Sequence, residues 1–328
     1  MNQTRAADTD IVLVGAGIMS ATLAVFLKEL EPSLRIEIFE TLEGAALESS
    51  DAWNNAGTGH AALCELNYTP QRSDGSIDIS KALAVNVEFD LSRQFWSYLI
   101  RKRALGSPDL FIHAVPHMSF VHGAAHVAYL KKRYAALTAH HLYRGMEFTE
   151  DKQTLRDWFP LVMEGRPDSD IIAATRMITG ADVNYGALTR SLIGYLQTLS
   201  GFAIHYSRRV TGLNREDGGR WRIETIDAAN NAQTSTTAKF VFLGAGGGAL
   251  PLLQKSGFRK RTVTPASRSA AFGCAATTQP STNGITPKST AWPMSVRRRC
   301  PFRTLIPGSS ATPVRSCSGP MPGSPPSS

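Results

Sequence analysis

A strand, a glycine turn, a helix and a second strand follow one another within the first forty residues, and this order constrains the fold more than any other feature. Residues 11–14 (IVLV) are wholly apolar, as is typical of a parallel strand buried on both faces. A Gly-Ala-Gly turn follows at once, and residues 18–30 then have helical spacing. Residues 34–39 alternate apolar and charged side chains and lead to an acidic residue. The succession predicts a β-turn-α-β unit of the dinucleotide-binding type.

The glycine turn suits the pyrophosphate of a dinucleotide. Gly15 permits the tight turn, and Gly17 lets the backbone approach a pyrophosphate that lies at the positive end of the helix. Ser20 is a small substitute for the third glycine of the fingerprint. Glu40 lies 23 residues beyond Gly17, where a carboxylate can bind ribose hydroxyls and where an acid disfavours NADP. A solvated strand end is the alternative interpretation of Glu40.

The same stretch allows a second interpretation. Residues 11–27 are uncharged over 17 positions, which is the lower limit for a helix that crosses a membrane. A membrane span is therefore the alternative to a nucleotide turn, although the placement of the glycines favours the turn.

Two later segments extend the nucleotide site. Residues 50–70 (SDAWNNAGTGHAALCELNYTP) have little periodicity, and the small residues at 56–59 would let a flat ring lie against the backbone. Residues 239–243 (KFVFL) form another buried strand, which runs into a glycine-rich stretch that includes Gly244 and Gly246. We expect this strand to return the chain to the nucleotide sheet.

The segments between these motifs predict an interrupted nucleotide domain, as in two-domain flavoproteins. Strand patterns cover residues 203–213 and 220–226. Helical patterns cover residues 81–103, 127–137 and 188–199. The first of these helices has an apolar stripe that we expect to be buried, made of Leu91, Phe95, Trp96, Tyr98 and Leu99.

Composition divides the chain at about Phe258. Residues 258–328 hold ten of the 35 lysines and arginines, 11 of the 18 prolines and none of the 27 acidic residues. The net charge of +8 therefore belongs to this tail, and residues 1–257 give no reason to expect a nucleic-acid partner. Cys64 is the one cysteine before the tail, so we expect an intracellular protein without a disulfide framework.

Several stretches resemble malate:quinone oxidoreductase, a flavin enzyme of the tricarboxylic acid cycle. They run in order along residues 10–257 and read DIVLVGAGIMSATL, WNNAGTGHAALCELNYTP, GSIDISKAL, SRQFWSYL, VPHMSFV, LVMEGR and TGADVNYGALTR. The resemblance implies that FAD is bound, that (S)-malate is oxidised to oxaloacetate and that electrons pass to a membrane quinone. It also implies a peripheral protein on the cytoplasmic face of the bacterial membrane. A sister flavoprotein acting on another 2-hydroxy acid, such as 2-hydroxyglutarate, and a non-catalytic remnant or basic-tailed binding protein are the alternatives.

The resemblance implies a fold class and a domain division. The fold is α/β, with a Rossmann-like βαβ nucleotide domain and a mixed α+β substrate domain, incomplete at the C-terminus. The FAD-binding domain takes residues 1–110 and 180–257, and residues 111–179 belong to the substrate domain. Analogy also assigns cofactor contacts: pyrophosphate to Gly15, Gly17 and Ser20, ribose to Glu40, the flavin border to Asn55, Thr58, Gly59 and His60, and adenine to the backbone of Val210.

Oxidation of a secondary alcohol needs a hydride acceptor, a base for the hydroxyl proton and a cation for the carboxylates. Flavin supplies the first, and histidine is the natural base near neutral pH. His60, His113 and His117 are the candidates, and a structural histidine is the alternative for each. Arg144 and Arg176 are candidate carboxylate clamps, with surface charge as their alternative. No cysteine or histidine spacing predicts a metal site.

The basic tail has a genetic explanation. Read in the frame two nucleotides on, residues 258–273 permit PEADGYAGFPVSGLW, residues 294–307 permit VGAPPMSVPHLDT, and residues 315–328 permit LLFGPYAGFSTKF. These strings resemble later parts of the same family, in order and in one frame. We therefore expect a single frameshift near Phe258, an out-of-frame and disordered tail at residues 258–328, and an inactive chain.

Overall fold

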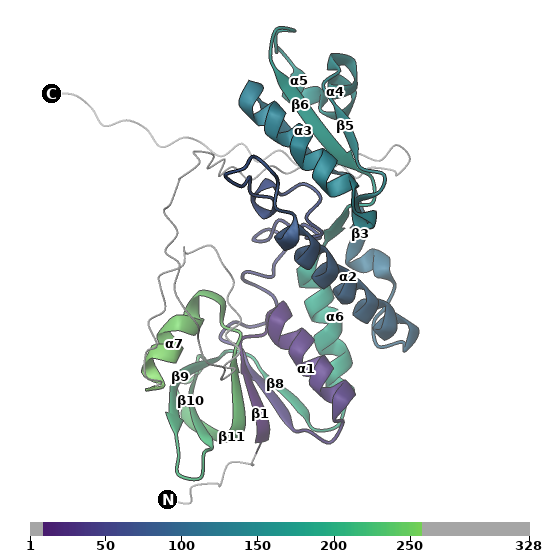
Figure 1. Cartoon of the computed structure of the whole chain (residues 1–328). Coiled ribbons are helices and arrows are strands. Elements are labelled where there is room, and N and C mark those ends of the chain that lie inside the picture. The colour runs from purple at the N-terminus through teal and green to yellow at the C-terminus, as the bar shows by residue number, and fades with distance from the viewer. Residues whose placement is uncertain (1–8, 258–328) are drawn as a thin grey trace, which may run out of the picture. The chain divides into compact units, whose positions relative to one another are not determined.

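The computed structural model describes residues 9–257, shown in colour in Figure 1. The described residues belong to one compact unit. The tail at 258–328, for which the sequence predicts disorder, lies outside the described residues.

A six-stranded sheet carries the predicted nucleotide motif, with the strand order β8-β2-β1-β11-β10-β9. β8, β2, β1 and β11 run parallel to one another, whereas β10 is antiparallel to both β11 and β9. The six strands are β1 (Thr9–Val14), β2 (Ile36–Phe39), β8 (Phe202–His205), β9 (Arg208–Arg215), β10 (Trp221–Asp227) and β11 (Gln233–Leu243). The strand at 239–243 does return the chain to β1, as the sequence predicts.

The β-turn-α-β unit forms because β1 is apolar on both faces. Ile11 and Leu13 pack into one core, and Val12 and Val14 pack into another. α1 (Ile18–Leu30) begins and ends where the helical spacing predicts. Residues 11–27 are thus divided between a strand and a helix, and the alternative of a membrane span is wrong. In the part of the chain that the structure describes, no helix has the length and apolarity to cross a bilayer.

Helices cover both faces of this sheet. α1 and α6 (Tyr185–Gln197) lie side by side on one face, and α2 (Ser80–Arg101) joins the same core (Figure 1). The short α7 (Ala249–Lys255) packs against β9, and its Leu252 belongs to the core of the other face. Burial on both faces is what a parallel sheet requires.

Two details of the predicted elements are wrong. The stripe on α2 is only partly buried: Trp96 and Leu99 are inside, but Leu91 is 58% and Tyr98 42% exposed. Tyr98 stays at the surface because its hydroxyl donates to Glu29 at 2.6 Å. The predicted strand at 203–213 is two strands, β8 and β9, because Ser207 has a positive φ of 52° between them.

A smaller sheet lies between residues 117 and 177, with the order β4-β6-β5. Its strands are β4 (His117–His122), β5 (Glu147–Thr149) and β6 (Ile172–Met177). α3 (Ala124–Thr138) packs on one face, and α4 (Lys152–Trp158) and α5 (Pro160–Met163) pack on the other. A separate ribbon pairs β3 (Ile112–Ala114) with β7 (Ala181–Val183). The predicted division into two domains stays a prediction.

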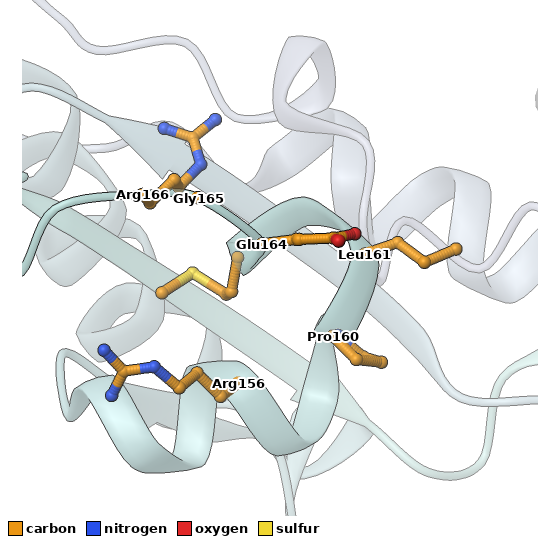
Figure 2. Close-up of a pocket in the computed structure, with 7 residues that line it drawn as sticks. Arg156, Pro160, Leu161, Glu164, Gly165 and Arg166 are labelled. Atoms are coloured by element: carbon orange, nitrogen blue, oxygen red, sulfur yellow. The ribbon is translucent and has the colours of Figure 1, made fainter.

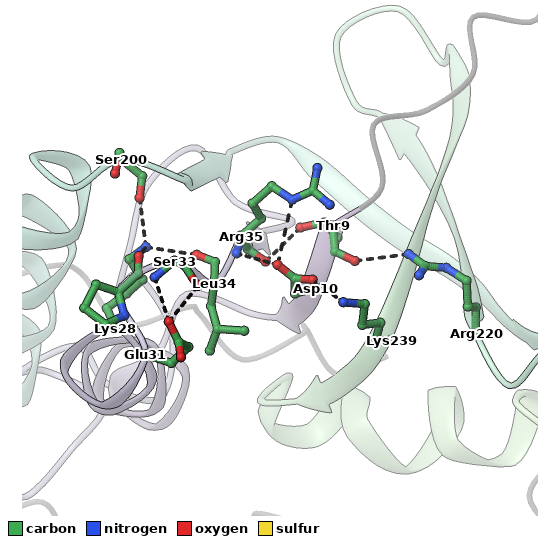
Figure 3. Close-up of polar contacts among 11 residues, drawn as sticks. Thr9, Asp10, Lys28, Glu31, Ser33, Leu34, Arg35, Ser200, Arg220 and Lys239 are labelled. Carbon is green, nitrogen blue, oxygen red and sulfur yellow. Dashed lines mark hydrogen bonds and ion pairs between the residues drawn. The ribbon is translucent and has the colours of Figure 1, made fainter.

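Polar side chains tie the amino-terminal edge of the large sheet together (Figure 3). Lys28 of α1 is buried, and its Nζ donates to the carbonyls of Pro32, Leu34 and Ser200 at 2.5, 2.9 and 2.8 Å. Burial lowers the pKa of Lys28. These three bonds fix the end of α1 against the segments that enter β2 and β8.

Candidate functional site

The carboxyl ends of β1, β2 and β11 meet at one edge of the sheet, and the predicted nucleotide residues lie there. Gly15 follows β1 with a φ of +94°, and its N–H donates to the carbonyl of Phe39 at 2.8 Å. A Cβ at Gly15 would lie 2.6 Å from the carbonyl oxygen of Gly244, which follows β11. Glycine is required at position 15 by its backbone conformation and by this close approach.

The amino end of α1 is open to an anion. The helix has no acidic residue in its first turn, and no side chain caps it at Gly17. Ser50 lies beside this end: its Oγ accepts from the N–H of Ile18 at 3.0 Å, and a Cβ at Gly17 would lie 3.2 Å from the same oxygen. The amides of the first helical turn and the helix dipole together favour a phosphate here. Nothing in the local sequence pattern marks Ser50 as a residue of this site.

Glu40 faces the glycine turn from the end of β2. Its Oε2 accepts from the N–H of Ala16 at 2.6 Å, and its Oε1 accepts from the N–H of Leu42 at 2.9 Å. The carboxylate is therefore held beside the turn, where the ribose of a dinucleotide would have to lie.

Ser20 packs against the chain that follows β11. It is fully buried on α1, and a Cβ at Gly244 would clash with its Oγ, so the small side chain allows the helix to pack closely on the chain after β11. Among residues 9–257 this Oγ has no hydrogen-bond partner. Gly246, with a φ of +50°, begins the 3-10 turn η4 (Gly246–Gly248).

Val210 lies in β9 at an irregularity of the sheet. It pairs with Thr225, whereas Gly212 pairs with Glu224, so one residue of β9 is extra. Its side chain is buried in the second core. The predicted contact between its backbone and an adenine ring stays a prediction.

The small residues of the loop run along β7, and we call residues 56–69 the histidine segment. Gly59 donates its N–H to the carbonyl of Ala181 at 2.8 Å, and Thr58 forms a bridge with Asp182. A Cβ at Gly59 would lie 2.6 Å from Phe89 and 2.8 Å from the Ala181 oxygen. Asn55 folds back before the segment, accepting from the N–H of Gly57 at 2.8 Å. Glycines are needed here because the segment is packed between β7 and α2.

His60 forms an ion pair inside this segment. Its Nδ1 lies 2.8 Å from Oε1 of Glu65. The hydrogen bond that the His60 ring donates to Glu65 raises the pKa of His60, and burial opposes this shift. Burial works to raise the pKa of Glu65, but the hydrogen bond from His60 and nearby positive charge leave that pKa lowered.

His117 approaches the same backbone from β4. The ring is buried, and its Nε2 lies 3.0 Å from the carbonyl oxygen of Ala181, which also accepts from Gly59. A carbonyl can only accept, so Nε2 carries a proton, and among the described residues Nδ1 has no hydrogen-bond partner. His60 and His117 thus lie on segments that meet at Ala181.

The other predicted residues lie elsewhere. Arg176 of β6 binds the carboxylate of Glu147 through Nε at 3.1 Å and Nη2 at 2.7 Å, and it stacks on Trp158. Arg144 is exposed at the end of a 3-10 turn, η3 (His141–Tyr143). His113 is exposed in β3. The structure does not bring these three to the histidine segment by any contact among the described residues.

A buried arginine anchors the histidine segment, and the sequence analysis missed it. Arg133 of α3 is fully buried; its Nε donates to Thr69 Oγ1 at 3.0 Å, and its Nη2 donates to the carbonyls of Ala62 and Leu63 at 3.2 and 3.3 Å. Burial lowers the pKa of Arg133. Asn86 of α2 adds a bond to the Ala61 carbonyl at 2.8 Å.

Two clefts formed by the described residues are candidate substrate sites. The larger, about 510 Å³, is lined by α4, α5 and the following turn, and Figure 2 shows Arg156 and Arg166 at its border. Both arginines are ion-paired, with Asp168 and Asp170 respectively, so neither offers an unpaired charge to a dicarboxylate.

The smaller cleft, about 210 Å³, borders the histidine segment. Its lining residues come from that segment, from α2 and from the turn before β7: Ala61, Leu63, Asn86, Phe89, Asp90, Arg93, Leu142, Thr179, Gly180 and Ala181. Gly180 packs on the His117 ring, since a Cβ there would lie 2.5 Å from Cδ2. Within residues 9–257, no group of three or more His, Cys, Asp or Glu is placed to hold a metal ion.

Solved structures share the fold. Glycine oxidase from Geobacillus kaustophilus has a TM-score of 0.54 at 17% identity, covering 76% of this chain and 58% of that one. L-alpha-glycerophosphate oxidase from Mycoplasma pneumoniae, solved with FAD bound, has a TM-score of 0.52 at 16% identity, covering 76% and 57%. The predicted α/β flavoprotein fold class is confirmed.

Sequence relatives are much more similar. Probable malate:quinone oxidoreductases from Bradyrhizobium diazoefficiens and Bordetella avium are 66% and 58% identical, each over 76% of this chain and over 49% and 50% of their own length. The chain thus spans about half the length of the relatives it matches. A profile of the malate:quinone oxidoreductase (Mqo) family matches residues 7–265. Because that match takes in most of the chain, the chain belongs to the malate:quinone oxidoreductase family.

Proposed function

We propose that the edge formed by β1, β2 and β11 binds FAD. The open amino end of α1, the close approach at Gly15 and the carboxylate of Glu40 fit the pyrophosphate and ribose of the ADP half. The Mycoplasma oxidase of the same fold, which holds FAD, supports the choice of flavin. Asn55, Thr58 and Gly59 would border the flavin ring, since Asn55 donates to the carbonyl of Ser49, the residue before Ser50 at the helix end.

The function that we propose for the complete protein is the oxidation of (S)-malate to oxaloacetate, with electrons passed to a membrane quinone in the tricarboxylic acid cycle. Family membership is the observation that carries this proposal. Bound flavin would accept the hydride from the substrate carbon. The protein would act at the cytoplasmic face of the bacterial membrane as a peripheral protein.

His60 of the histidine segment would supply the proton chemistry. His60 is half-exposed and paired with Glu65, so it can exchange a proton with a substrate. His117 is held by the Ala181 carbonyl and would orient the site rather than move a proton. Arg93, which lines the smaller cleft together with Asp90, adds a third candidate cation to Arg144 and Arg176.

We also propose that residues 258–328 are the product of a frameshift and that the chain as written is inactive. The abrupt loss of acidic residues at this point supports the proposal, and so does the end of the family match at residue 265. Resequencing the coding DNA across codons 250–265 tests it directly. An extra or missing base would support a frameshift, and an intact frame in the organism would refute a sequencing error.

Activity is tested on two proteins, the chain as printed and a frame-restored chain. We expect the frame-restored protein to purify with FAD and to reduce a quinone with (S)-malate, while the printed chain does not. 2-Hydroxyglutarate serves as the comparison donor. A frame-restored protein that prefers 2-hydroxyglutarate, or that binds no flavin, would overturn the proposed function.

A further inference from the structure

The two members of the His60–Glu65 pair differ in their exposure. The Glu65 side chain is 16% exposed, whereas the His60 side chain is 54% exposed. Their contact uses Nδ1 of the ring, which leaves Nε2 on the far side of the ring from Glu65. The carboxylate is thus the buried partner, and the ring is the partner with access to a ligand.

The backbone on both sides of Glu65 is held by side chains of other elements. Ser119 of β4 donates to the carbonyl of Cys64 at 2.8 Å, and Tyr129 of α3 donates to the carbonyl of Leu66 at 3.0 Å. Arg133 holds the Leu63 carbonyl. The backbone that carries Glu65 therefore takes its position from α3 and β4, and the buried carboxylate meets the His60 ring at 2.8 Å.

The charged groups around the pair keep Glu65 ionised. His60 and His117 act on its carboxyl, and the charge of Arg133 also lies within its range. Burial, followed by the charge of Glu65, raises the pKa of Cys64 to about 12, so the thiol stays neutral.

The remaining neighbours of the pair are an aromatic ring and two residues of α2. The Tyr68 ring meets the His60 ring edge-on, with 6.4 Å between the two centroids. The Nζ atom of Lys81 lies over the Tyr68 ring, 4.9 Å from its centroid. Burial, and then the charges of Glu65, Cys64 and Glu88, raise the pKa of Tyr68. Glu65 is the carboxylate in contact with His60 among the described residues.

We propose that Glu65 is a positioning residue for His60: it holds the proton on Nδ1 and leaves Nε2 as the acceptor for the substrate hydroxyl. The inference rests on the proposed function. Nε2 would take the proton of the C2 hydroxyl of the 2-hydroxy acid as the C–O bond becomes a carbonyl. Flavin, when bound, would supply the two-electron acceptor for the C2 hydride, so that the two-electron oxidation of the alcohol balances. A carboxylate on Nδ1 makes the opposite nitrogen a stronger base.

The pair itself is tested without any turnover. In the full 328-residue chain with ¹⁵N-labelled histidine, we expect His60 to titrate above the ordinary histidine range of about 6.5 and to carry its neutral-state proton on Nδ1. Glu65→Gln should bring the His60 pKa back toward that range and redistribute the proton between the two nitrogens. The exposed Glu164→Gln is the matched control and should leave His60 unchanged. An unchanged pKa and tautomer in Glu65→Gln would overturn the inference.

The catalytic consequence is tested in the frame-restored enzyme. If the 328-residue chain gives no resolved histidine spectrum, this second experiment tests the positioning role of Glu65 by itself. A base works when it is unprotonated, so kcat/KM should rise with pH through the His60 pKa. Glu65→Gln should move this rise to lower pH and reduce the plateau of kcat by at least about tenfold, with KM little changed. Glu65→Asp should restore part of the plateau. A pH profile that stays unmoved in Glu65→Gln would refute a positioning role, and an enzyme with normal pair titration but no malate oxidation would refute the proposed function alone.

Discussion

Two regions of the molecule are closely packed, the proposed dinucleotide-binding edge and the histidine segment. They differ in whether backbone or side-chain atoms make the close contacts. At the edge, backbone meets backbone: Gly15 lies against Gly244, and the N–H of Gly15 donates to the carbonyl of Phe39 at the end of β2. In the histidine segment, backbone carbonyls are held by side chains such as Arg133 and Ser119, which come from other elements. A site made of backbone leaves a local pattern in the sequence, and a site held by distant side chains does not.

The largest effect should come from the backbone contact. Gly15→Ala combines a positive φ with a Cβ 2.6 Å from the Gly244 oxygen, and it should lower the free energy of unfolding by about 3 kcal/mol and abolish ADP binding. Gly145→Ala is the control, because Gly145 also has a positive φ of 88° but nothing near its missing Cβ. That variant should lose only about 1 kcal/mol. Chemical denaturation and ADP titration measure both, and equal losses would remove the role given to the close approach.

The buried arginine comes next. Arg133→Met would leave two carbonyls and Thr69 without the Arg133 donor, so we expect the free energy of unfolding to fall by about 3 kcal/mol. Removal of the buried charge is itself stabilising and should offset part of this loss. Lys131→Met, on the exposed side of the same helix, should change stability by about 0.5 kcal/mol or less. ADP affinity should be unchanged in both. Weaker ADP binding in Arg133→Met would mean that the two regions are coupled.

A smaller effect should separate Glu40 from its neighbours on β2. Glu40→Gln keeps an acceptor but removes the charge that faces the amide of Ala16, so ADP affinity should fall about tenfold. Glu37→Gln removes a charge from the same strand, where the partner is His205, and should leave ADP affinity unchanged. Isothermal titration with ADP compares the two variants. Equal affinities would return Glu40 to the interpretation of a solvated strand end.

The smallest effect is a pH dependence in the histidine segment. The folded pKa of His60 is raised, so its contribution to stability is complete below about pH 6.5 and is lost as pH rises through the folded value. The folded pKa of Glu65 is lowered, so its contribution is complete above about pH 4.5 and is lost as pH falls through the folded value. Wild type should therefore exceed Glu65→Gln in stability most near pH 5–6, and solvent screening keeps the difference under about 1 kcal/mol. A difference that grows above pH 8 would contradict the assignment of the pair.

The edge could be predicted from the sequence more fully than the histidine segment, because its contacts come from backbone and not from distant side chains. The bounds of α1 and the return of β11 to β1 follow from apolar runs and glycines that lie next to one another in the chain. Ser50 could not be found that way, because its bond to Ile18 depends on how a loop folds back.

The histidine segment shows the same limit more strongly. Its composition marks it as unusual, but its anchors lie on α2, α3 and β4. Arg133 has the spacing of an ordinary helical charge, and only the packed structure shows that it is fully buried. Leu91 is the reverse case, an apolar residue of a predicted core stripe that lies at the surface of α2.

The order of strands in the large sheet also determines how this chain must fold. β1 is among the first described elements to leave the ribosome, but its partner on one side is β11, whose register pairs Val14 with Leu243. The edge of β1 that pairs with β11 therefore stays unpaired while all the intervening elements are synthesised. Pairing across so long a loop is slow, and exposed strand edges invite association with other chains. We expect synthesis of this sheet to depend on chaperones until β11 has emerged.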